Sequence, residues 1–313
     1  MDQATNQILF ALLRSVISGE PIAEAEKTQI LSCPLEGLLS LARKHDLLHL
    51  EAFALQKNSL VAEEYDPRRD IFAAVMRYEQ LEHALGKLCA VLEEEKIPFL
   101  PLKGSVLRKH YPEPWMRTSC DIDILVREED VERASELLVG RCGYARGVKS
   151  SHDVSLLADG KHVELHYDLV EEGLAASSAE VLRSVWEAST VCDGYRYRYE
   201  MPDAMFYFYH VAHMAKHFEN GGCGIRPFID LWILDHLAGA DSDGRNALLE
   251  KGGLLRFAEA CRRLSRAWLG GEEMDALGEQ LQAYLLYGGT YGATENRIAV
   301  GQQKKGGAHR LAF

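Results

Sequence analysis

The stretch that decides the fold runs from Leu102 to Val126 and reads LKGSVLRKHYPEPWMRTSCDIDILV. A Gly104-Ser105 turn follows an apolar run, and Asp121 and Asp123 then alternate with isoleucines in a strand-like segment. Because side chains alternate between the two faces of a strand, both carboxylates point the same way. Adjacent carboxylates repel each other, and a buried pair is tolerated mainly when a cation neutralises it. Hard oxygen ligands of this kind favour Mg2+.

A third carboxylate lies in the run HVELHY at positions 162–167. Glu164 and the histidine two residues later share one face of this predicted strand. The preceding run VSLLA (154–158) is also apolar, and Asp159-Gly160 between the two runs is typical of a type I′ hairpin. We therefore expect Glu164 on a hairpin strand beside the strand of the two aspartates. Three converging carboxylates can hold two Mg2+ ions, as in phosphoryl and nucleotidyl transfer.

Single features of this pattern also have structural explanations. An isolated D-x-D is most often a solvated strand edge, but the apolar flanks of this one indicate a buried strand, where unpaired aspartates are costly. Glu164 has the alternative of a surface carboxylate on an edge strand, paired with Lys161 or Arg146.

The combination resembles the signature of the nucleotidyltransferase superfamily related to DNA polymerase beta. More narrowly, PLKG, YPEPWMR and DIDILV resemble a largely uncharacterised bacterial family of nucleotidyltransferases. The main resemblance covers about residues 97–170, with looser similarity in HVAHMAKHF (210–218) and IRPFIDLWIL (225–234). The resemblance implies functional roles for a set of five residues: Gly104, Ser105, Asp121, Asp123 and Glu164.

The expected reaction moves a nucleoside monophosphate from an NTP, with ATP as the expected donor, to an acceptor hydroxyl, and releases pyrophosphate. Asp121, Asp123 and Glu164 are expected to bind two Mg2+ ions, and Asp123 or Glu164 to take the acceptor proton. The Gly104-Ser105 amides and the Ser105 hydroxyl are expected to bind the phosphates. The acceptor is a small molecule or a protein side chain. The alternative is a non-catalytic nucleotide-binding or regulatory module on the same fold.

Two basic residues flank this core. Lys103 precedes the turn and Arg117 precedes the aspartate strand, so either can neutralise a triphosphate. The alternative is that they pair with Asp121, Asp123 or Glu113 and fix the loop. In the same loop, Trp115 is either a stacking surface for a base or a core residue.

Three histidines, His210, His213 and His217, fall on one face of a predicted helix. We expect them to line the nucleotide cleft rather than bind zinc, because H-x-x-H-x-x-x-H lacks the glutamate of a zinc protease helix. Arg226 contacts either the triphosphate or the acceptor, or else forms a salt bridge with Asp230 in the same helix.

Composition limits the remaining possibilities. The net charge of −12 over 313 residues disfavours broad binding to nucleic acid, and hence an RNA-extending polymerase. Seven scattered cysteines without C-x-x-C are typical of free thiols in a reducing cytosol. A basic leader with an apolar segment is missing, and apolar runs stay short of the ~20 residues that span a bilayer. We expect a soluble, cytoplasmic protein without membrane contact.

The order of predicted elements gives an α+β fold, with a small mixed sheet flanked by helices. We expect an N-terminal helical region (1–95), a nucleotidyltransferase core (96–175) and a C-terminal helical domain (176–313) with a flexible glycine-rich tail. The long helices expected from periodicity and helix-end signals are 68–95, 128–139, 203–218, 225–238, 254–269 and 273–287.

Overall fold

The computed structural model describes residues 3–158, 160–171, 173–290 and 292. The predicted glycine-rich tail falls largely outside these residues, as does Asp159 of the predicted hairpin turn.

A five-stranded mixed sheet forms the centre of the fold. Its order is β1-β2-β5-β4-β3, with β2 and β5 parallel and the other neighbours antiparallel. The strands are β1 (Phe99–Pro101), β2 (Asp121–Val126), β3 (Ala145–Lys149), β4 (Asp153–Ala158) and β5 (Lys161–His166). The predicted β4–β5 hairpin is confirmed. The sequence did not predict β3, because all five of its residues are exposed and leave no apolar alternation to detect.

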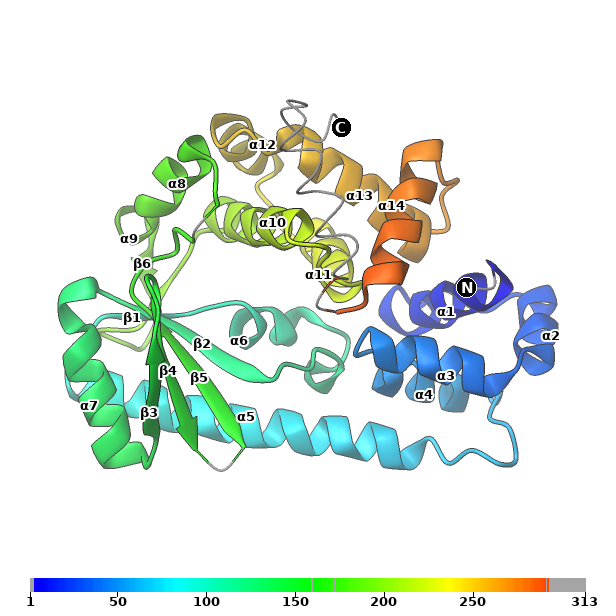
Figure 1. The fold of residues 1–313 in the computed structure, drawn as a ribbon, viewed down its shortest axis with the longest axis horizontal. Helices are drawn as coiled ribbons and strands as arrows, with labels where there is room; N and C mark the ends of the chain where they lie inside the picture. Colours follow the sequence, from blue (N-terminus) through cyan, green and yellow to red (C-terminus); the bar gives the residue numbers. More distant parts are fainter. Residues whose placement is uncertain (1–2, 159, 172, 291, 293–313) are drawn as a thin grey trace.

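Two helices cover one face of this sheet. Figure 1 shows α5 (Arg68–Glu94) running beneath the strands and α7 (Val131–Cys142) beside it. Ile122 and Ile124 of β2 and Val163 and Leu165 of β5 are fully buried against these helices. Alternation therefore turns the acidic residues of both strands toward the opposite face.

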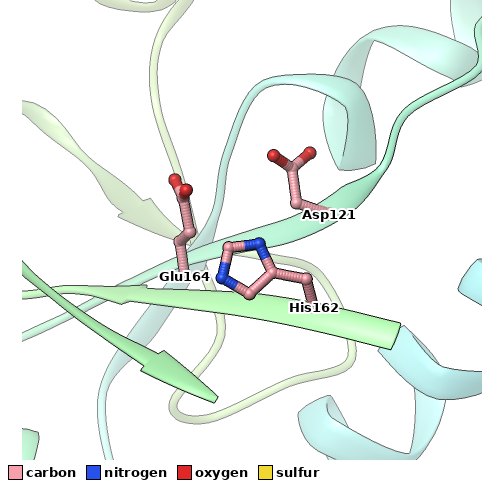
Figure 2. A group of neighbouring side chains, drawn as sticks. All are labelled: Asp121, His162 and Glu164. Atoms are coloured by element: carbon pink, nitrogen blue, oxygen red, sulfur yellow. The ribbon is translucent and has the colours of Figure 1, made fainter. Parts of the chain in front are cut away.

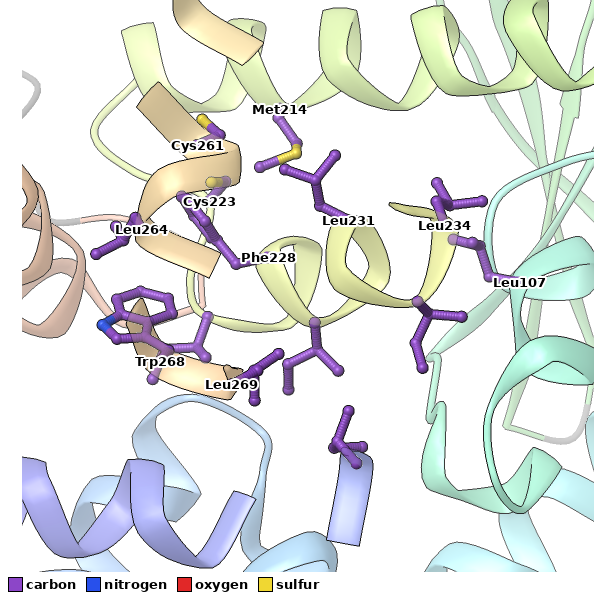
Figure 3. Packing of buried hydrophobic residues seen from close by; sticks show 14 of the residues in the cluster. Leu107, Met214, Cys223, Phe228, Leu231, Leu234, Cys261, Leu264, Trp268 and Leu269 are labelled. Atoms are coloured by element: carbon purple, nitrogen blue, oxygen red, sulfur yellow. The ribbon is translucent and has the colours of Figure 1, made fainter. Parts of the chain in front are cut away.

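The opposite face lies toward α10 (Asp203–Glu219), which crosses above the sheet in Figure 1. Three further helices continue this layer: α11 (Arg226–Asp235), α13 (Leu255–Leu269) and α14 (Ala276–Gly288). Helix α11 contacts α10 and packs against α13, and α13 packs against α14. Phe228 of α11 packs against Trp268 of α13, with ring centroids 5.1 Å apart (Figure 3). A further helix, α12 (Ser242–Lys251), was not predicted, because SDGRNALLEK carries too few apolar residues to show a helical period.

The N-terminal segment is also helical, as predicted. It contains α1 (Gln3–Ile17), α2 (Glu24–Ser32), α3 (Leu35–Lys44) and α4 (Leu48–Lys57). The apolar segment 38–50 is divided between α3 and α4, with Asp46 at φ 57° in the break. Phe10 of α1 stacks on Trp268 of α13 at 4.4 Å, so one hydrophobic cluster joins the N-terminal and C-terminal helices. The division into three domains stays a prediction.

Shorter elements connect these layers. They are α6 (Gly104–Leu107), α8 (Ala176–Arg183), α9 (Val185–Ala188), three 3-10 turns (108–110, 114–116 and 128–130), and a small hairpin of β6 (Thr190–Val191) and β7 (Tyr199–Glu200). The predicted α+β class is confirmed. Among the residues that the structure describes, no helix has both the length and the apolar character needed to cross a bilayer.

Candidate active site

The three predicted carboxylates meet on the face of the sheet toward α10. Because β2 and β5 are parallel neighbours, Asp123 lies opposite Glu164 in register, and Asp121 lies opposite His162. Figure 2 shows Asp121, His162 and Glu164 projecting from the two strands toward the same space. The three carboxylates, Asp121, Asp123 and Glu164, border a cavity of about 410 Å³ between the sheet and α10. Glu164 is on an internal strand, so the edge-strand alternative is wrong, and Arg146 pairs with Glu132 instead.

Side-chain hydrogen bonds from Arg108 and Ser119 hold the start of β2 against the Lys103-Gly104 turn. The buried Arg108 guanidinium donates to the Gly104 carbonyl at 2.9 Å and to Ser119 Oγ at 3.2 Å. Ser119 Oγ in turn donates to the Asp121 carbonyl at 3.0 Å. The turn and the aspartate strand therefore form one unit, which places Gly104 on the wall of the carboxylate cavity.

Asp123 is the most deeply paired of the three carboxylates. It is 3 % exposed, Lys103 Nζ donates to its Oδ1 at 2.7 Å, and His166 Nε2 lies 3.0 Å from the same oxygen. Burial alone would raise the pKa of Asp123, but the Lys103 ammonium and His166 together hold this pKa far below its ordinary value. Asp123 is therefore a permanent anion at neutral pH.

Asp121 has a different electrostatic setting from Asp123. Burial raises the pKa of Asp121, the neighbouring Asp123 carboxylate raises it further, and Lys103 only partly opposes this shift. Two adjacent carboxylates with opposed pKa shifts indicate a site in which the protein alone does not supply enough positive charge.

The donor atoms suit a hard divalent cation. Two sets of potential ligands, Asp121–His162–Glu164 and Asp123–Glu164–His166, each bring one donor atom per residue to within 4.8 Å of the others. Glu164 belongs to both sets, and carboxylate oxygens predominate, as Mg2+ prefers. The residues present therefore fit the metal that the sequence pattern implied.

The three predicted histidines of α10 all border the same cavity, on the wall opposite the strands. His210 is hydrogen-bonded to the Pro227 carbonyl at 3.0 Å. His213 is linked at both ring nitrogens, to Glu171 Oε1 at 3.3 Å through Nδ1 and to His217 Nε2 at 3.0 Å through Nε2. Burial, with Lys103 acting the same way, holds the pKa of His213 well below its ordinary value. Burial and the nearby basic groups lower the pKa of His217 to about 3, so both rings are neutral near pH 7.

Three predicted site residues have other surroundings. Arg117 borders the cavity, but its Nε and Nη2 donate to the two oxygens of Asp230 at 2.7 and 2.9 Å. Arg226 pairs with Asp46 at 2.7 Å rather than with Asp230, so the predicted helical salt bridge is wrong. Asp46 lies in the loop after α3 and Arg226 begins α11, so this pair forms only in the folded chain.

Ser105 is the third of these residues. It is not among the described residues that border the carboxylate cavity, and it faces two other cavities behind the turn. Its Oγ is buried without a hydrogen-bond partner in the described part of the chain. One helical residue beyond Gly104 is enough to turn the side chain away. Trp115 packs edge-on against Phe53 at 5.3 Å, which is the predicted core alternative.

Sequence reasoning gave no role to several residues of this cavity. His166 shares a face with Glu164 and contacts Asp123, and the alternation of HVELHY was the signal for it. Glu171 contacts His213 and forms an ion pair with Lys216, yet it follows β5 in a segment without a motif. No periodicity could have predicted that contact, because it joins a loop to a helix turn about 40 residues away.

Comparisons with known proteins give a family match and a similar solved structure. A family model described as "Uncharacterised nucleotidyltransferase" matches residues 34–270. No curated protein matches the sequence significantly. Among solved structures, the chain is similar to the solution structure of the antibiotic-resistance factor ANT(2'')-Ia, at a TM-score of 0.34 and 12 % identity, over 59 % of this chain and 94 % of that one.

Proposed function

This chain belongs to the uncharacterised nucleotidyltransferase family, and from that premise we propose that it transfers an NMP from an NTP to an acceptor hydroxyl. The acceptor oxygen forms a bond to the α-phosphorus, the bond to the β-phosphate oxygen breaks, and pyrophosphate leaves. The reaction depends on Mg2+, with two ions in the site. One observation carries the proposal: Asp123 and Glu164 face each other on parallel strands, with Asp121 and Gly104 on the same cavity.

Asp121, Asp123 and Glu164 would hold the ions. When bound, Mg2+ would neutralise phosphate charge and lower the pKa of the acceptor hydroxyl. The Gly104 backbone at the cavity wall binds the phosphates, and Lys103 supplies a positive charge beside them. Neither the Ser105 hydroxyl nor Arg117 is part of this proposal, because the first faces another cavity and the second is saturated by Asp230.

Glu164 is the proposed proton acceptor. Asp123 is held anionic by Lys103 and His166, which makes it a weak base, whereas the Glu164 side chain is 28 % exposed to the cavity. The acceptor hydroxyl enters between Glu164 and the α10 wall, where His213 and His217, which are hydrogen-bonded to each other through their Nε2 atoms, line the space. His210, hydrogen-bonded to the Pro227 carbonyl, and Arg226, paired with Asp46, also border this space.

ATP is the proposed donor, and a small molecule or a protein side chain the acceptor. We place the protein in the cytoplasm, in line with its seven free cysteines. The alternative, a nucleotide-binding module without transfer, is favoured by one observation: Asp123 and Glu164 already have a counter-ion, Lys103, without a metal.

The test measures binding and transfer separately. Calorimetry with Mg2+ and the α,β-methylene analogue of ATP is run on the wild type, Asp121→Asn and Asp123→Asn. Asp153→Asn is the matched control, because it removes a carboxylate from the same cavity outside the proposed set. Transfer is followed as label from α-32P-ATP onto a metabolite extract or protein mixture, with release of pyrophosphate.

We expect the analogue to bind the wild type and the control, and to lose at least tenfold in affinity in Asp121→Asn and Asp123→Asn. Equal affinity in all four proteins would show that the carboxylates are not the nucleotide site. Carboxylate-dependent binding without label transfer or pyrophosphate release from any NTP would favour the non-catalytic module.

A further inference from the structure

Lys103 has an unusual backbone conformation. Its φ is 44° and its ψ is −121°, a combination that L residues other than glycine rarely adopt. Its carbonyl accepts hydrogen bonds from the amides of Val106 and Leu107, which fixes it at the start of α6. Residues persist in such conformations only when the surrounding structure imposes them, and they gather at functional sites.

The strained backbone directs the Lys103 side chain into the carboxylate group. Its Nζ lies 2.7 Å from Asp123 Oδ1 and 3.6 Å from Glu164 Oε2. Asp123, Glu164 and His166 are one of the two sets whose donor atoms could share a metal ion. The ammonium therefore contacts two of the three donors of that set and takes up the space and charge that a cation would need.

A metal ion and this ammonium cannot both keep these contacts. A divalent ion bound to Asp123 and Glu164 would lie only a few Å from Nζ, where two positive charges repel strongly. The four-carbon stem of lysine is flexible, and the Gly104 backbone wall lies next to it, so phosphate oxygens bound there are within its range.

We propose that Lys103 is a resident counter-ion that makes metal binding at the carboxylates depend on nucleotide. In the free protein the ammonium is the shared counter-ion of Asp123 and Glu164. When a metal–nucleotide complex enters, the ammonium moves to the phosphate oxygens and leaves the carboxylates to the metal. This inference rests on the proposed function and adds an order of binding: free divalent ions bind weakly, and nucleotide and metal strengthen each other's binding equally.

The experiment uses Mn2+ as the metal, with bound and free ion separated by electron paramagnetic resonance. The wild type is compared with Lys103→Met, which removes the ammonium, and with Lys103→Arg, which retains a charge. Lys109→Met is the matched control, since it removes an exposed lysine six residues away that does not border the carboxylate cavity. Each protein is titrated alone and with the α,β-methylene analogue of ATP.

Without nucleotide, we expect Lys103→Met to bind Mn2+ at least tenfold more tightly than the wild type, Lys103→Arg and Lys109→Met. The analogue should tighten Mn2+ binding at least tenfold in the wild type and less than threefold in Lys103→Met. Thermal unfolding gives a second readout in case the loss of the ammonium beside Asp123 and Glu164 weakens the fold. Mn2+ without nucleotide should then raise the midpoint of Lys103→Met more than that of the wild type.

The outcomes separate the two proposals. If the wild type binds Mn2+ with the analogue, but free Mn2+ binds Lys103→Met and the wild type within a factor of two, the counter-ion role is refuted and the proposed function stands. If no protein binds Mn2+ under any condition, the carboxylates are not a metal site, and both proposals fail.

Discussion

The ion pair between Arg117 and Asp230 gives the sharpest single prediction, because sequence reasoning assigned Arg117 to the nucleotide. Both side chains are almost fully buried, at 9 % and 1 % exposure. Two guanidinium nitrogens bind the two carboxylate oxygens, and the Tyr111 hydroxyl donates to Asp230 Oδ1 at 2.6 Å. This cluster joins the loop before β2 to α11, so we expect Arg117 to stabilise the fold rather than to bind phosphate.

Arg117→Met should therefore destabilise the protein strongly. Removing one partner of a buried ion pair typically costs about 3–5 kcal/mol, because the other charge stays buried without compensation. That is a large part of the roughly 5–15 kcal/mol that holds a typical protein folded. In this variant, Asp230 would keep only the neutral hydrogen bond from Tyr111, which is too weak to offset the lost ion pair.

The stability cost of Arg117→Met also depends on pH. Burial by itself raises the pKa of Asp230, whereas Arg117, His210 and Tyr111 bring it below the ordinary value in the native protein. Without Arg117, burial prevails and the folded-state pKa rises above the unfolded value. A carboxyl group with a raised folded pKa loses stability as pH rises through about 4, so the penalty of Arg117→Met should be larger at pH 7 than at pH 4.

The assay is urea unfolding followed by circular dichroism, at pH 7 and pH 4. Arg43→Met is the matched control, because Arg43 pairs with Glu36 at the surface, and we expect it to cost less than about 1 kcal/mol. The double variant Arg117→Met/Asp230→Leu should recover most of the stability, since apolar residues replace the pair. If Arg117→Met costs less than about 1 kcal/mol while Mg2+–nucleotide affinity falls tenfold, Arg117 is a nucleotide ligand and the buried-pair argument is wrong.

Three further predictions concern buried or strained groups. Glu51 is fully buried, burial raises its pKa well above the ordinary value, and neither carboxylate oxygen has a hydrogen-bond partner within the described residues. Glu51→Leu should therefore raise the unfolding free energy by about 1–3 kcal/mol in urea titrations, and a loss of stability would contradict this. Burial lowers the pKa of His45 to about 4, so the neutral ring's contribution to stability is complete above the unfolded-state pKa of about 6.5 and disappears as pH falls toward 4. His45→Gln should flatten the profile of unfolding free energy against pH in that window by about 3 kcal/mol, and an unchanged slope would refute the lowered pKa. Lys103→Gly should be more stable than Lys103→Ala by about 1 kcal/mol or more in thermal unfolding, because both remove the ammonium but only glycine accepts φ 44°; equal midpoints would show that the backbone there is unstrained.

Local patterns in the sequence were enough to predict the chemical core of the site. Alternation in DIDILV and HVELHY predicted which carboxylates share a face, and the Asp159-Gly160 signal predicted the hairpin that carries Glu164. Strand alternation is a property of the backbone, so it does not depend on what packs against the strand. The long helix α5 was predicted for the same reason, since its apolar stripe repeats at the helical period.

Partner choice among charged residues depended on the tertiary structure. Lys103 pairs with Asp123, which was one of three partners that the sequence offered. Arg117 pairs with Asp230 and Arg226 with Asp46, over separations of 113 and 180 residues, and the sequence offered neither of these pairs. No local pattern carries that information, because a salt bridge depends only on distance in space, and chain segments far apart meet only after the helices pack. The sequence by itself therefore determined the elements and the face on which the carboxylates lie. The tertiary contacts among the Lys103 turn, the loop before β2, the loop after α3 and α11 decided which cations neutralise those carboxylates and which are used to hold the fold together.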